Sequence, residues 1–278
     1  MDRERNRKRH NSRCGSAASG KHAILLLKVE GMYIRPSIFQ TVPGVLAAVS
    51  TRNGGVSPDP LGMNLSFSVG DEEANVLRNR ELFFGGLGID LRELAIPRQV
   101  HGSLLLRVRT AGSFADTDGL VTDAPRVFLC VTVADCVPIL LCDPHAPAVS
   151  VVHAGWRGTA SGILAAAVRR MQEEFGTNPA TLLAYVGPAA GACCYEVGPD
   201  VAARFDARFL QQRGEHAHVD LKSANRTQLL NAGLQEEHIE VNPSCTIEEP
   251  ARFHSYRRDG DRSGRMMGVI GILSPSQG

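Results

Sequence analysis

Four side chains with chemical potential stand where apolar runs of this sequence break. The run VFLCVTV (127–133) is followed closely by Asp135 and Cys136, and the run AVSVV (148–152) ends at His153, with Arg157 just beyond. Runs of four to eight β-branched and apolar residues predict strands buried on both faces. We therefore expect an acid, a thiol, an imidazole and a guanidinium at the end of a rigid sheet. A buried polar group left without a partner costs about 1–3 kcal/mol, so this arrangement predicts a functional site.

A second imidazole, His101, follows an extended segment at residues 96–100. Two imidazoles and a thiolate are good ligands for Zn²⁺, and three protein ligands leave the fourth position that catalytic zinc requires. The same set would accept copper. His101, Cys136 and His153 are separated by 35 and 17 residues, and this spacing matches none of the local zinc signatures. Spacing alone therefore leaves open whether these histidines bind a metal or hydrogen-bond within the structure.

The elements that must position these side chains alternate along the chain. Besides the central apolar runs, strands are predicted at residues 24–29, 45–50, 96–100, 104–110, 182–186 and 266–273. Helices are expected over residues 71–84 with an Asp71 cap, over 159–175, over 199–209 from Pro199, and over 223–233 with a Ser223 cap. The 159–175 segment carries an apolar stripe at Ile163, Ala167, Met171 and Phe175. The pattern predicts an α/β fold: a single domain, residues 23–278, built on a mixed β-sheet with flanking helices.

Charge and hydropathy narrow the class of protein further. The 278 residues carry a net charge of +1, but residues 1–22 hold seven Lys or Arg against two acids, so the body has no basic excess. Nucleic-acid binding is therefore not expected. The first 22 residues are polar and without periodicity, which predicts a disordered basic tail. No apolar run suits a signal peptide or a membrane span, which favours a cytoplasmic protein with no membrane partner.

The seven cysteines are odd in number and include no Cys-x-x-Cys pair. A disulfide framework is typical of short secreted chains, so these residues are interpreted as reduced thiols. Cys130 and Cys142 lie inside apolar runs and are expected in the core. Cys136 differs because it follows Asp135 at a break between two runs.

Several longer motifs resemble the YfiH-type family, whose members are known both as laccase-domain or polyphenol oxidoreductase proteins and as purine nucleoside phosphorylases. The matching stretches are TRNGGVS (51–57), RQVHG (98–102), ADCVP (134–138), VVHAGWRG (151–158), GPAAGACCYEVG (187–198) and FHSYRRDGDRSGR (253–265). The resemblance covers residues 45–273, and ADCVP together with HAGWRG is highly specific. It implies that His101, Cys136 and His153 bind a metal ion, Zn²⁺ with Cu²⁺ as the alternative.

The resemblance also implies an activity: phosphorolysis of purine nucleosides (adenosine, inosine, guanosine and methylthioadenosine) together with zinc-dependent deamination of adenosine. Small-molecule nucleosides and phosphate are then the partners. A carboxylate must move protons during deamination, and Asp135 is the nearest candidate, although an Asp that holds a turn fits equally. The cationic donors for phosphate are expected among Arg52, Arg157, Arg257 and Arg265. Asn64 and Tyr195 are candidates to bind ribose or base, or to stabilise their loops.

Other functions remain open at this stage. A copper-dependent polyphenol oxidase would use the same His₂Cys set, but a multicopper site needs several His-x-His pairs, and this chain has only His216 and His218. An amide hydrolase that edits cell-wall precursors could use the same open zinc. A binding module without catalysis would not need the metal. There is neither a dinucleotide-binding nor a phosphate-loop motif, and nothing in the sequence indicates an oligomeric state.

Overall fold

The computed structural model describes residues 31–274. The predicted tail at 1–22 and the predicted strand at 24–29 lie outside the described residues. The strands are β1 (Tyr33–Ile34), β2 (Val45–Ser50), β3 (Leu94–Pro97), β4 (Leu105–Arg107), β5 (Gly112–Phe114), β6 (Gly119–Thr122), β7 (Phe128–Val133), β8 (Val137–Asp143), β9 (Ala148–Ala154), β10 (Leu183–Val186), β11 (Glu196–Val197), β12 (Leu210–Arg213), β13 (His216–Val219), β14 (Ile239–Val241) and β15 (Met266–Ile272).

The α-helices are α2 (Glu73–Gly86), α3 (Trp156–Ala160), α4 (Ile163–Phe175), α5 (Pro199–Ala202), α6 (Leu221–Asn231) and α7 (Tyr256–Asp259). Short 3₁₀ turns lie at η1 (Ser37–Phe39), η2 (Leu91–Glu93), η3 (Pro179–Thr181), η4 (Ala207–Phe209), η5 (Glu236–His238) and η6 (Gly260–Arg262). Within the described chain, no helix is both long enough and apolar enough to span a bilayer.

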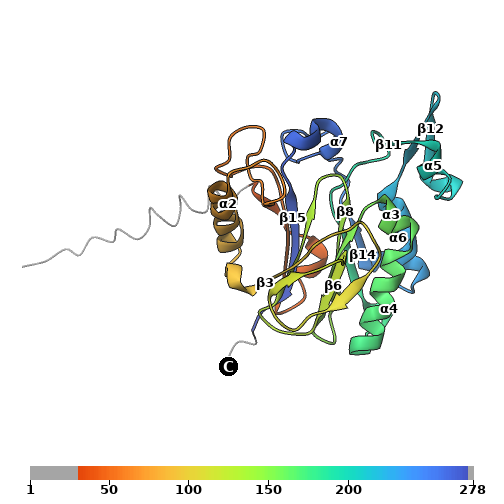
Figure 1. Cartoon of the computed structure of the whole chain (residues 1–278). Coiled ribbons are helices and arrows are strands. Elements are labelled where there is room, and N and C mark those ends of the chain that lie inside the picture. Colours follow the sequence, from red (N-terminus) through yellow and green to blue (C-terminus); the bar gives the residue numbers. More distant parts are fainter. Residues whose placement is uncertain (1–30, 275–278) are drawn as a thin grey trace, which may run out of the picture.

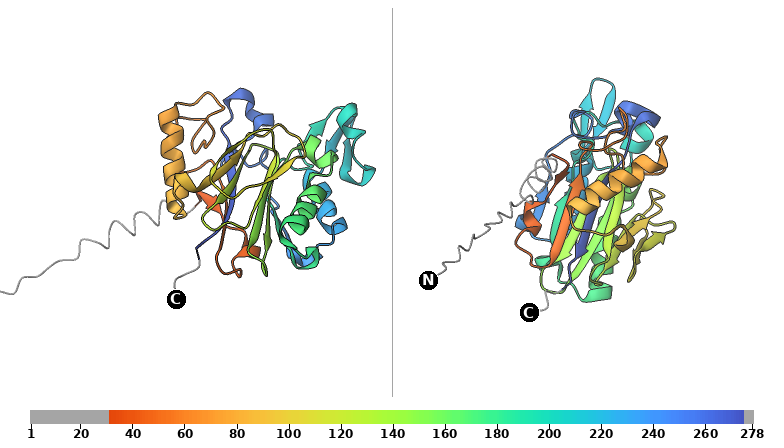
Figure 2. Two further views of the ribbon diagram at one scale, coloured as in Figure 1. Left: turned by 60° about the horizontal axis from the view of Figure 1, so that its bottom comes forward. Right: turned by 90° about the vertical axis from the view of Figure 1, so that its left-hand side faces the viewer.

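Two mixed six-stranded sheets pack face to face. The first sheet has the order β1-β2-β15-β7-β3-β5, and the second has the order β14-β10-β8-β9-β6-β4. Helix α2 covers the outer face of the first sheet, while α3, α4 and α6 cover the second (Figures 1 and 2). A small sheet of β11, β13 and β12 extends from one corner. The predicted single α/β domain is confirmed, and the expected mixed sheet proves to be a pair of sheets.

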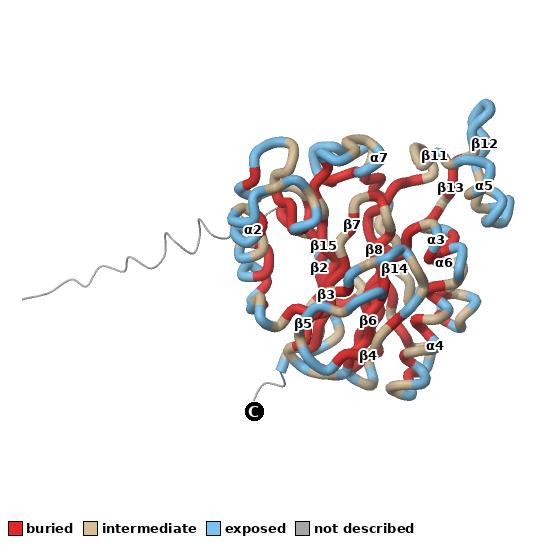
Figure 3. Tube along the Cα trace, in the orientation of Figure 1, coloured by how far each residue is buried: buried red, intermediate tan, exposed pale blue. Residues whose placement is uncertain are grey.

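The alternation of side chains in β8 and β9 explains why these strands read as continuous apolar runs. In β8, Ile139 and Leu141 face the helices, whereas Leu140 and Cys142 lie in the core between the sheets. Both faces are therefore buried, as the red central strands of Figure 3 show. Burying each such side chain contributes about 1.5–3 kcal/mol, which makes this pair of sheets a firm base for the residues at its ends.

The expected Asp71 cap is wrong. Helix α2 begins at Glu73 without a side-chain cap, because the Asp71 carboxylate accepts hydrogen bonds from Ser57 and Asn64 instead. The Ser223 cap is also wrong, since Asp220 caps α6 and its carboxylate accepts from both the backbone amide and the hydroxyl of Ser223. In the first case tertiary hydrogen bonds engage the expected cap, whereas in the second the cap is the acid three residues before the expected serine.

Four predicted elements are shorter than expected. The 159–175 helix is divided by Gly162, whose φ of +77° ends α3 and starts α4, although Ile163, Ala167 and Met171 are buried as the stripe predicts. The helix from Pro199 ends at Ala202, and Asp206 starts a separate 3₁₀ turn. The strand predicted at 96–100 is β3, which ends at Pro97 because the chain turns away there to carry His101. The strand predicted at 104–110 is the shorter β4.

Candidate functional site

Cys136 and His153 are adjacent because β8 and β9 pair in register. Cys136 immediately precedes β8, and the antiparallel ladder places Val137 opposite Ala154 and Pro138 opposite His153. The chain reaches Cys136 from β7 of the first sheet, so the short turn at 134–136 crosses from one sheet to the other. Within that turn Asp135 has a φ of +85°, a conformation that few non-glycine residues adopt. The chain therefore makes this tight cross-over with a residue in an uncommon backbone conformation.

His101 completes a cluster of three metal-ligand side chains with Cys136 and His153, which we call the cavity cluster. Their ligand atoms all lie within 4.8 Å of one another, and the two imidazole rings stand edge to face at 4.8 Å. His101 also has a positive φ, of 59°. Two residues in sparsely populated backbone conformations at one place indicate that the fold holds this arrangement against local strain.

Gly155 provides the space around the cavity cluster. A Cβ atom at this position would lie 3.1 Å from the Cys136 sulfur and 3.2 Å from Cδ2 of His101. Its φ of −74° is ordinary, so the backbone conformation does not require glycine. The need for glycine is therefore steric, and the missing side chain leaves room among the three ligands.

Asp118 holds both histidines in position. Its carboxylate lies 2.8 Å from Nδ1 of His153 and accepts hydrogen bonds from the backbone amides of Val100, His101 and Gly102. The Asp118 carbonyl accepts from the His153 amide at 2.7 Å. Because Nδ1 is engaged, Nε2 of His153 is left as the ligand atom. Carboxylates that orient a metal-binding imidazole in this way are a common feature of zinc sites.

The pKa values of Cys136 and His153 depend on each other. Burial opposes the charge on the Cys136 thiol, but the neighbouring His153 and His101 outweigh burial and lower its pKa to about 6. Burial likewise opposes the charge on His153, yet Cys136 and Asp118 outweigh it and raise the pKa of His153 to about 9. At neutral pH the metal-free pair is therefore a thiolate beside an imidazolium. The donor set of one thiolate and two imidazoles fits zinc or copper.

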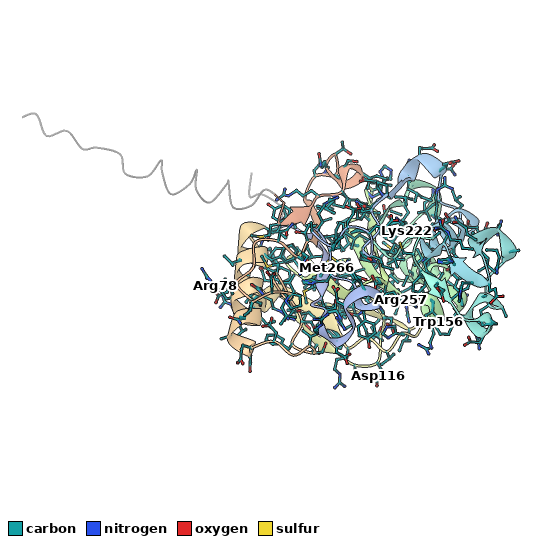
Figure 4. The ribbon with its side chains drawn as sticks, turned by 90° about the horizontal axis from the view of Figure 1, so that it is seen from above. Arg78, Asp116, Trp156, Lys222, Arg257 and Met266 are labelled. Carbon is teal, nitrogen blue, oxygen red and sulfur yellow. The ribbon has the colours of Figure 1, made fainter. Side chains whose placement is uncertain are left out.

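A cavity of about 1120 Å³ opens over the cavity cluster, large enough for a nucleoside together with phosphate. Besides the cluster it is lined by Trp156, Arg157, Tyr195, Arg257 and Arg265. Figure 4 looks down on this end of the molecule, with Trp156 on α3 and Arg257 on α7 labelled. The cavity thus joins residues from both sheets and from segments far apart in the sequence.

Three of the four predicted phosphate-binding arginines line this cavity. Arg157 lies over the Trp156 ring at 4.4 Å, and among residues 31–274 its guanidinium has no hydrogen-bond or ion-pair partner. Arg257 lies over the Tyr195 ring at 5.1 Å and donates to the Glu196 carbonyl. Arg265 donates to the carbonyls of Ser263 and Gly264. Of these three arginines, Arg157 is therefore the one best placed to bind an anion.

Arg52 and Asn64 are not brought to the cavity. The Arg52 guanidinium donates to the Pro250 and Pro60 carbonyls and lines a separate, smaller pocket. Asn64 is fully buried, and its side chain contacts Ser66, Asp71 and the Arg265 amide. Both residues tie loops together. Ser66, Phe67 and Ser68 of the same segment do line the cavity, so this loop forms part of its wall.

Asp135 lines the cavity, but both of its carboxylate oxygens are engaged. One accepts from the Thr246 hydroxyl at 2.7 Å and the other from the Arg257 amide at 2.6 Å. The side chain thereby anchors the segment that carries Arg257. Of the two roles considered from the sequence, these contacts favour the one in which Asp135 holds a turn.

Sequence reasoning missed the role of Asp118 and the presence of Arg98 in the cavity wall. Asp118 stood in a loop rich in Asp and Gly, and no local pattern separated it from Asp116. The only available signal was its place directly before the apolar segment Gly119–Thr122. An acid at the start of a buried strand must find partners, and here those partners are His153 and three backbone amides.

The fold and the site together define an α/β protein with a double mixed sheet and a His₂Cys cluster at the floor of a large cavity. The family model described as "Multi-copper polyphenol oxidoreductase laccase" matches residues 46–273. The chain belongs to this family, as its resemblance to YfiH-type proteins predicts.

Two similar proteins are named purine nucleoside phosphorylases, and a similar protein has a solved structure. The Bacillus subtilis protein named purine nucleoside phosphorylase YlmD is 36% identical over 252 residues, covering 82% of this chain and 88% of the relative. A Deinococcus radiodurans protein named purine nucleoside phosphorylase is 40% identical over 230 residues, covering 81% and 88% respectively. The crystal structure of YlmD from Geobacillus stearothermophilus matches with a TM-score of 0.82 at 34% identity, covering 87% of this chain and 96% of that one.

Proposed function

We propose that this protein is a metal-dependent purine nucleoside phosphorylase that also deaminates adenosine. The observation that carries the proposal is the meeting of two kinds of group in one cavity: the cavity cluster and the guanidinium groups of Arg157, Arg257 and Arg265. A purine nucleoside needs an apolar and aromatic wall, and phosphate needs cations. The names of the similar proteins support the phosphorylase activity.

His101, Cys136 and His153 would hold the metal ion, with zinc the proposed ion and copper the alternative. A bound divalent cation would supply Lewis acidity at the cavity floor. Three protein ligands leave a position free for another group, as catalytic zinc sites require. Asp118 fixes the orientation of the His153 ring and the backbone that carries His101, so the three ligands are positioned before the ion arrives.

In the proposed phosphorolysis, a phosphate oxygen attacks C1′ of the ribose, and the bond from C1′ to the purine nitrogen breaks. Arg157 would hold the phosphate, because its guanidinium is stacked on Trp156 and has donors to spare. Charge-assisted hydrogen bonds of this kind are about twice as strong as neutral ones. Arg257 would support the same anion from α7, where the Asp135 carboxylate accepts a hydrogen bond from its backbone amide.

Tyr195 and Trp156 would bind the nucleoside. Burial raises the pKa of the Tyr195 hydroxyl to about 12, so at neutral pH it remains a hydrogen-bond donor for ribose or base. Trp156 presents an indole ring whose face already attracts the Arg157 cation. A nucleoside stacked near this ring would bring C1′ close to the anion held by Arg157.

The test is product analysis of adenosine incubated with the metal-loaded protein, with and without phosphate. The proposal predicts adenine and ribose 1-phosphate only when phosphate is present, and inosine in both cases. Adenine released equally without phosphate would indicate hydrolysis instead. The Cys142→Ser variant is a matched control, since Cys142 is a buried thiol of β8 outside the cavity cluster.

A copper-dependent phenol oxidase is the second candidate, favoured by the description of the matching family model. Within residues 31–274, His101 and His153 are the only histidines that line the cavity, whereas His216 and His218 belong to the small sheet. A multicopper centre needs more imidazoles than this. Oxidation of a phenol by the copper-loaded protein, at a rate above that of adenosine phosphorolysis, would favour this alternative.

A further inference from the structure

A second group of metal-ligand side chains lies apart from the cavity cluster. It consists of Cys193, Cys194, Cys245 and Glu248, whose ligand atoms all lie within 4.8 Å of one another. Cys193 and Cys194 come from the loop between β10 and β11, and Cys245 and Glu248 come from the loop after β14. We call this group the thiol cluster. None of its four side chains lines the large cavity.

The backbone around the thiol cluster is arranged for sulfur. The Gly191 amide donates to the Cys245 sulfur at 3.2 Å, and the two loops are joined by a parallel bridge between Ala189 and Cys245. A Cβ atom at position 191 would lie 3.1 Å from the Cys193 sulfur and 3.3 Å from the Cys245 sulfur. Gly191 therefore leaves open the space between the sulfur atoms, as Gly155 does for the cavity cluster.

Positive charge lies next to the thiol cluster. The Lys222 ammonium donates to the carbonyls of Asn242, Pro243 and Ser244, immediately before Cys245. The Arg258 guanidinium donates to the carbonyls of Thr246 and Ile247, immediately after it. Three thiolates and a carboxylate around a divalent cation carry a net charge of about −2, and Lys222 would offset part of it, whereas Arg258 is already ion-paired with Asp259.

We propose that Cys193, Cys194, Cys245 and Glu248 form a second, structural metal site for a zinc-like divalent cation. Four ligands close a tetrahedral site and leave no open position, which separates it in kind from the cavity cluster. Binding forms three metal–sulfur bonds and one metal–oxygen bond, and the thiol protons pass to water. A disulfide would use two of the sulfur atoms and give no role to the third or to Glu248.

The second ion would clamp two walls of the large cavity. Tyr195, which lines the cavity, directly follows Cys194, and Thr246, which donates to Asp135, directly follows Cys245. Linking Cys194 to Cys245 through one ion therefore fixes the Tyr195 loop relative to the turn that contains Asp135 and Cys136. The thiol cluster supports the cavity without contacting its contents.

The test is the zinc content of the reduced, zinc-saturated full-length protein, measured by native mass spectrometry. We expect about two ions in the wild type and in Cys142→Ser, and about one in both Cys136→Ser and Cys194→Ser. With Co²⁺ in place of zinc, the ion retained by Cys136→Ser should show strong thiolate-to-metal absorption, because three sulfur atoms bind it. The ion retained by Cys194→Ser should show a weaker band.

Glu248→Gln is the gentler variant, since Glu248 is exposed and its replacement should leave the fold intact. In the Cys136→Ser background it should weaken zinc binding by at least about tenfold and lower the melting temperature of the zinc-loaded protein. A Cys136→Ser protein that folds but holds no ion would overturn the proposal. Wild-type protein prepared without reductant should have the mass of the free thiols, and a mass lower by two hydrogens with only one ion bound would overturn the proposal in favour of a disulfide.

Discussion

Two regions of this molecule carry polar motifs of similar appearance, yet their polar groups are used differently. In the loop at residues 51–71, the side chains bond to one another and to nearby carbonyls, as Arg52 and Asn64 show. At the cavity cluster, the ligand atoms of His101, Cys136 and His153 converge on a space that Gly155 leaves free. A polar residue in a specific motif is therefore a candidate site residue only where its polar atoms are not already bonded to other groups of the protein.

The largest expected effect comes from removing the one thiolate of the cavity cluster. Cys136→Ser should abolish metal retention there and eliminate phosphorolysis and deamination, because serine is a poor zinc ligand and the site keeps only two imidazoles. Metal analysis and initial rates on adenosine measure both effects. Cys142→Ser, one strand length away in β8, should retain metal and activity. Equal metal content at the cavity cluster in the two variants would show that Cys136 is not a ligand.

Replacing one arginine of each region with alanine tests this comparison directly. Arg157→Ala should reduce phosphorolysis by about 10- to 150-fold and deamination less, because a lost charge-assisted contact to phosphate costs about 1.5–3 kcal/mol. Arg52→Ala removes hydrogen bonds to the Pro60 and Pro250 carbonyls and should lower the melting temperature while the ratio of the two activities stays constant. Adenine and inosine formation from adenosine give this ratio. If Arg52→Ala is the variant that shifts it, the phosphate site has been assigned to the wrong region.

Two hydrogen-bonded carboxylates, Asp118 at the cavity cluster and Asp71 in the 51–71 loop, form a second matched pair. Asp118→Asn should weaken metal binding at the cavity cluster by about 10- to 100-fold, because the His153 ring loses its anionic partner. Asp71→Asn affects contacts to Ser57 and Asn64 and should lower stability by about 1–3 kcal/mol without changing metal affinity. Competition with a metal indicator and chemical denaturation separate the outcomes. An equal loss of metal affinity in Asp118→Asn and Asp71→Asn would show that Asp118 has no specific role at the cavity cluster.

Much of the fold follows from patterns that are local in the sequence. The continuous apolar runs that become β7, β8 and β9 predicted strands buried on both faces, and Val45–Ser50 was placed with its correct limits. The helix starts of α2 and α6 could not be predicted in the same way. Tertiary hydrogen bonds engage Asp71 and leave α2 without a side-chain cap, and at α6 the sequence pattern did not separate Asp220 from Ser223. That two sheets form instead of one depends on which strands pair over long separations, such as β15 with β2.

The candidate site shows the same division between local and tertiary information. The sequence already singled out His101, Cys136 and His153 as one candidate set, because each stands next to a strand within a family motif. Arg52 could not be separated from Arg157 by type or motif, since only the fold determines which guanidinium is already engaged. The thiol cluster could not be predicted because Cys194 and Cys245 are far apart in the chain. Their two loops are brought together by an isolated β-bridge between Ala189 and Cys245.

The smallest expected effect is the release of a proton when zinc binds to the cavity cluster. In the metal-free protein the raised pKa of His153, about 9, keeps its imidazole protonated below that pH, and the lowered pKa of Cys136, about 6, keeps its thiolate above that pH. Near pH 8 zinc should therefore displace about one proton from this pair, and its affinity should increase with pH up to about 9. Calorimetry of Cys194→Ser in buffers of different ionisation enthalpy measures the release. No release near pH 8 would contradict the thiolate–imidazolium pair.

The most direct measurement of the central claim follows the oxygen atoms of phosphate. Adenosine is incubated with the metal-loaded protein and phosphate labelled with a heavy oxygen isotope, and the sugar product is analysed by mass spectrometry. We expect ribose 1-phosphate that retains every labelled oxygen. The Cys136→Ser variant should form none of this product, and the Cys142→Ser variant should form as much as the wild type. Free ribose carrying oxygen from water, or an unchanged yield from Cys136→Ser, would contradict the claim that the cavity above His101, Cys136 and His153 is a nucleoside phosphorylase site.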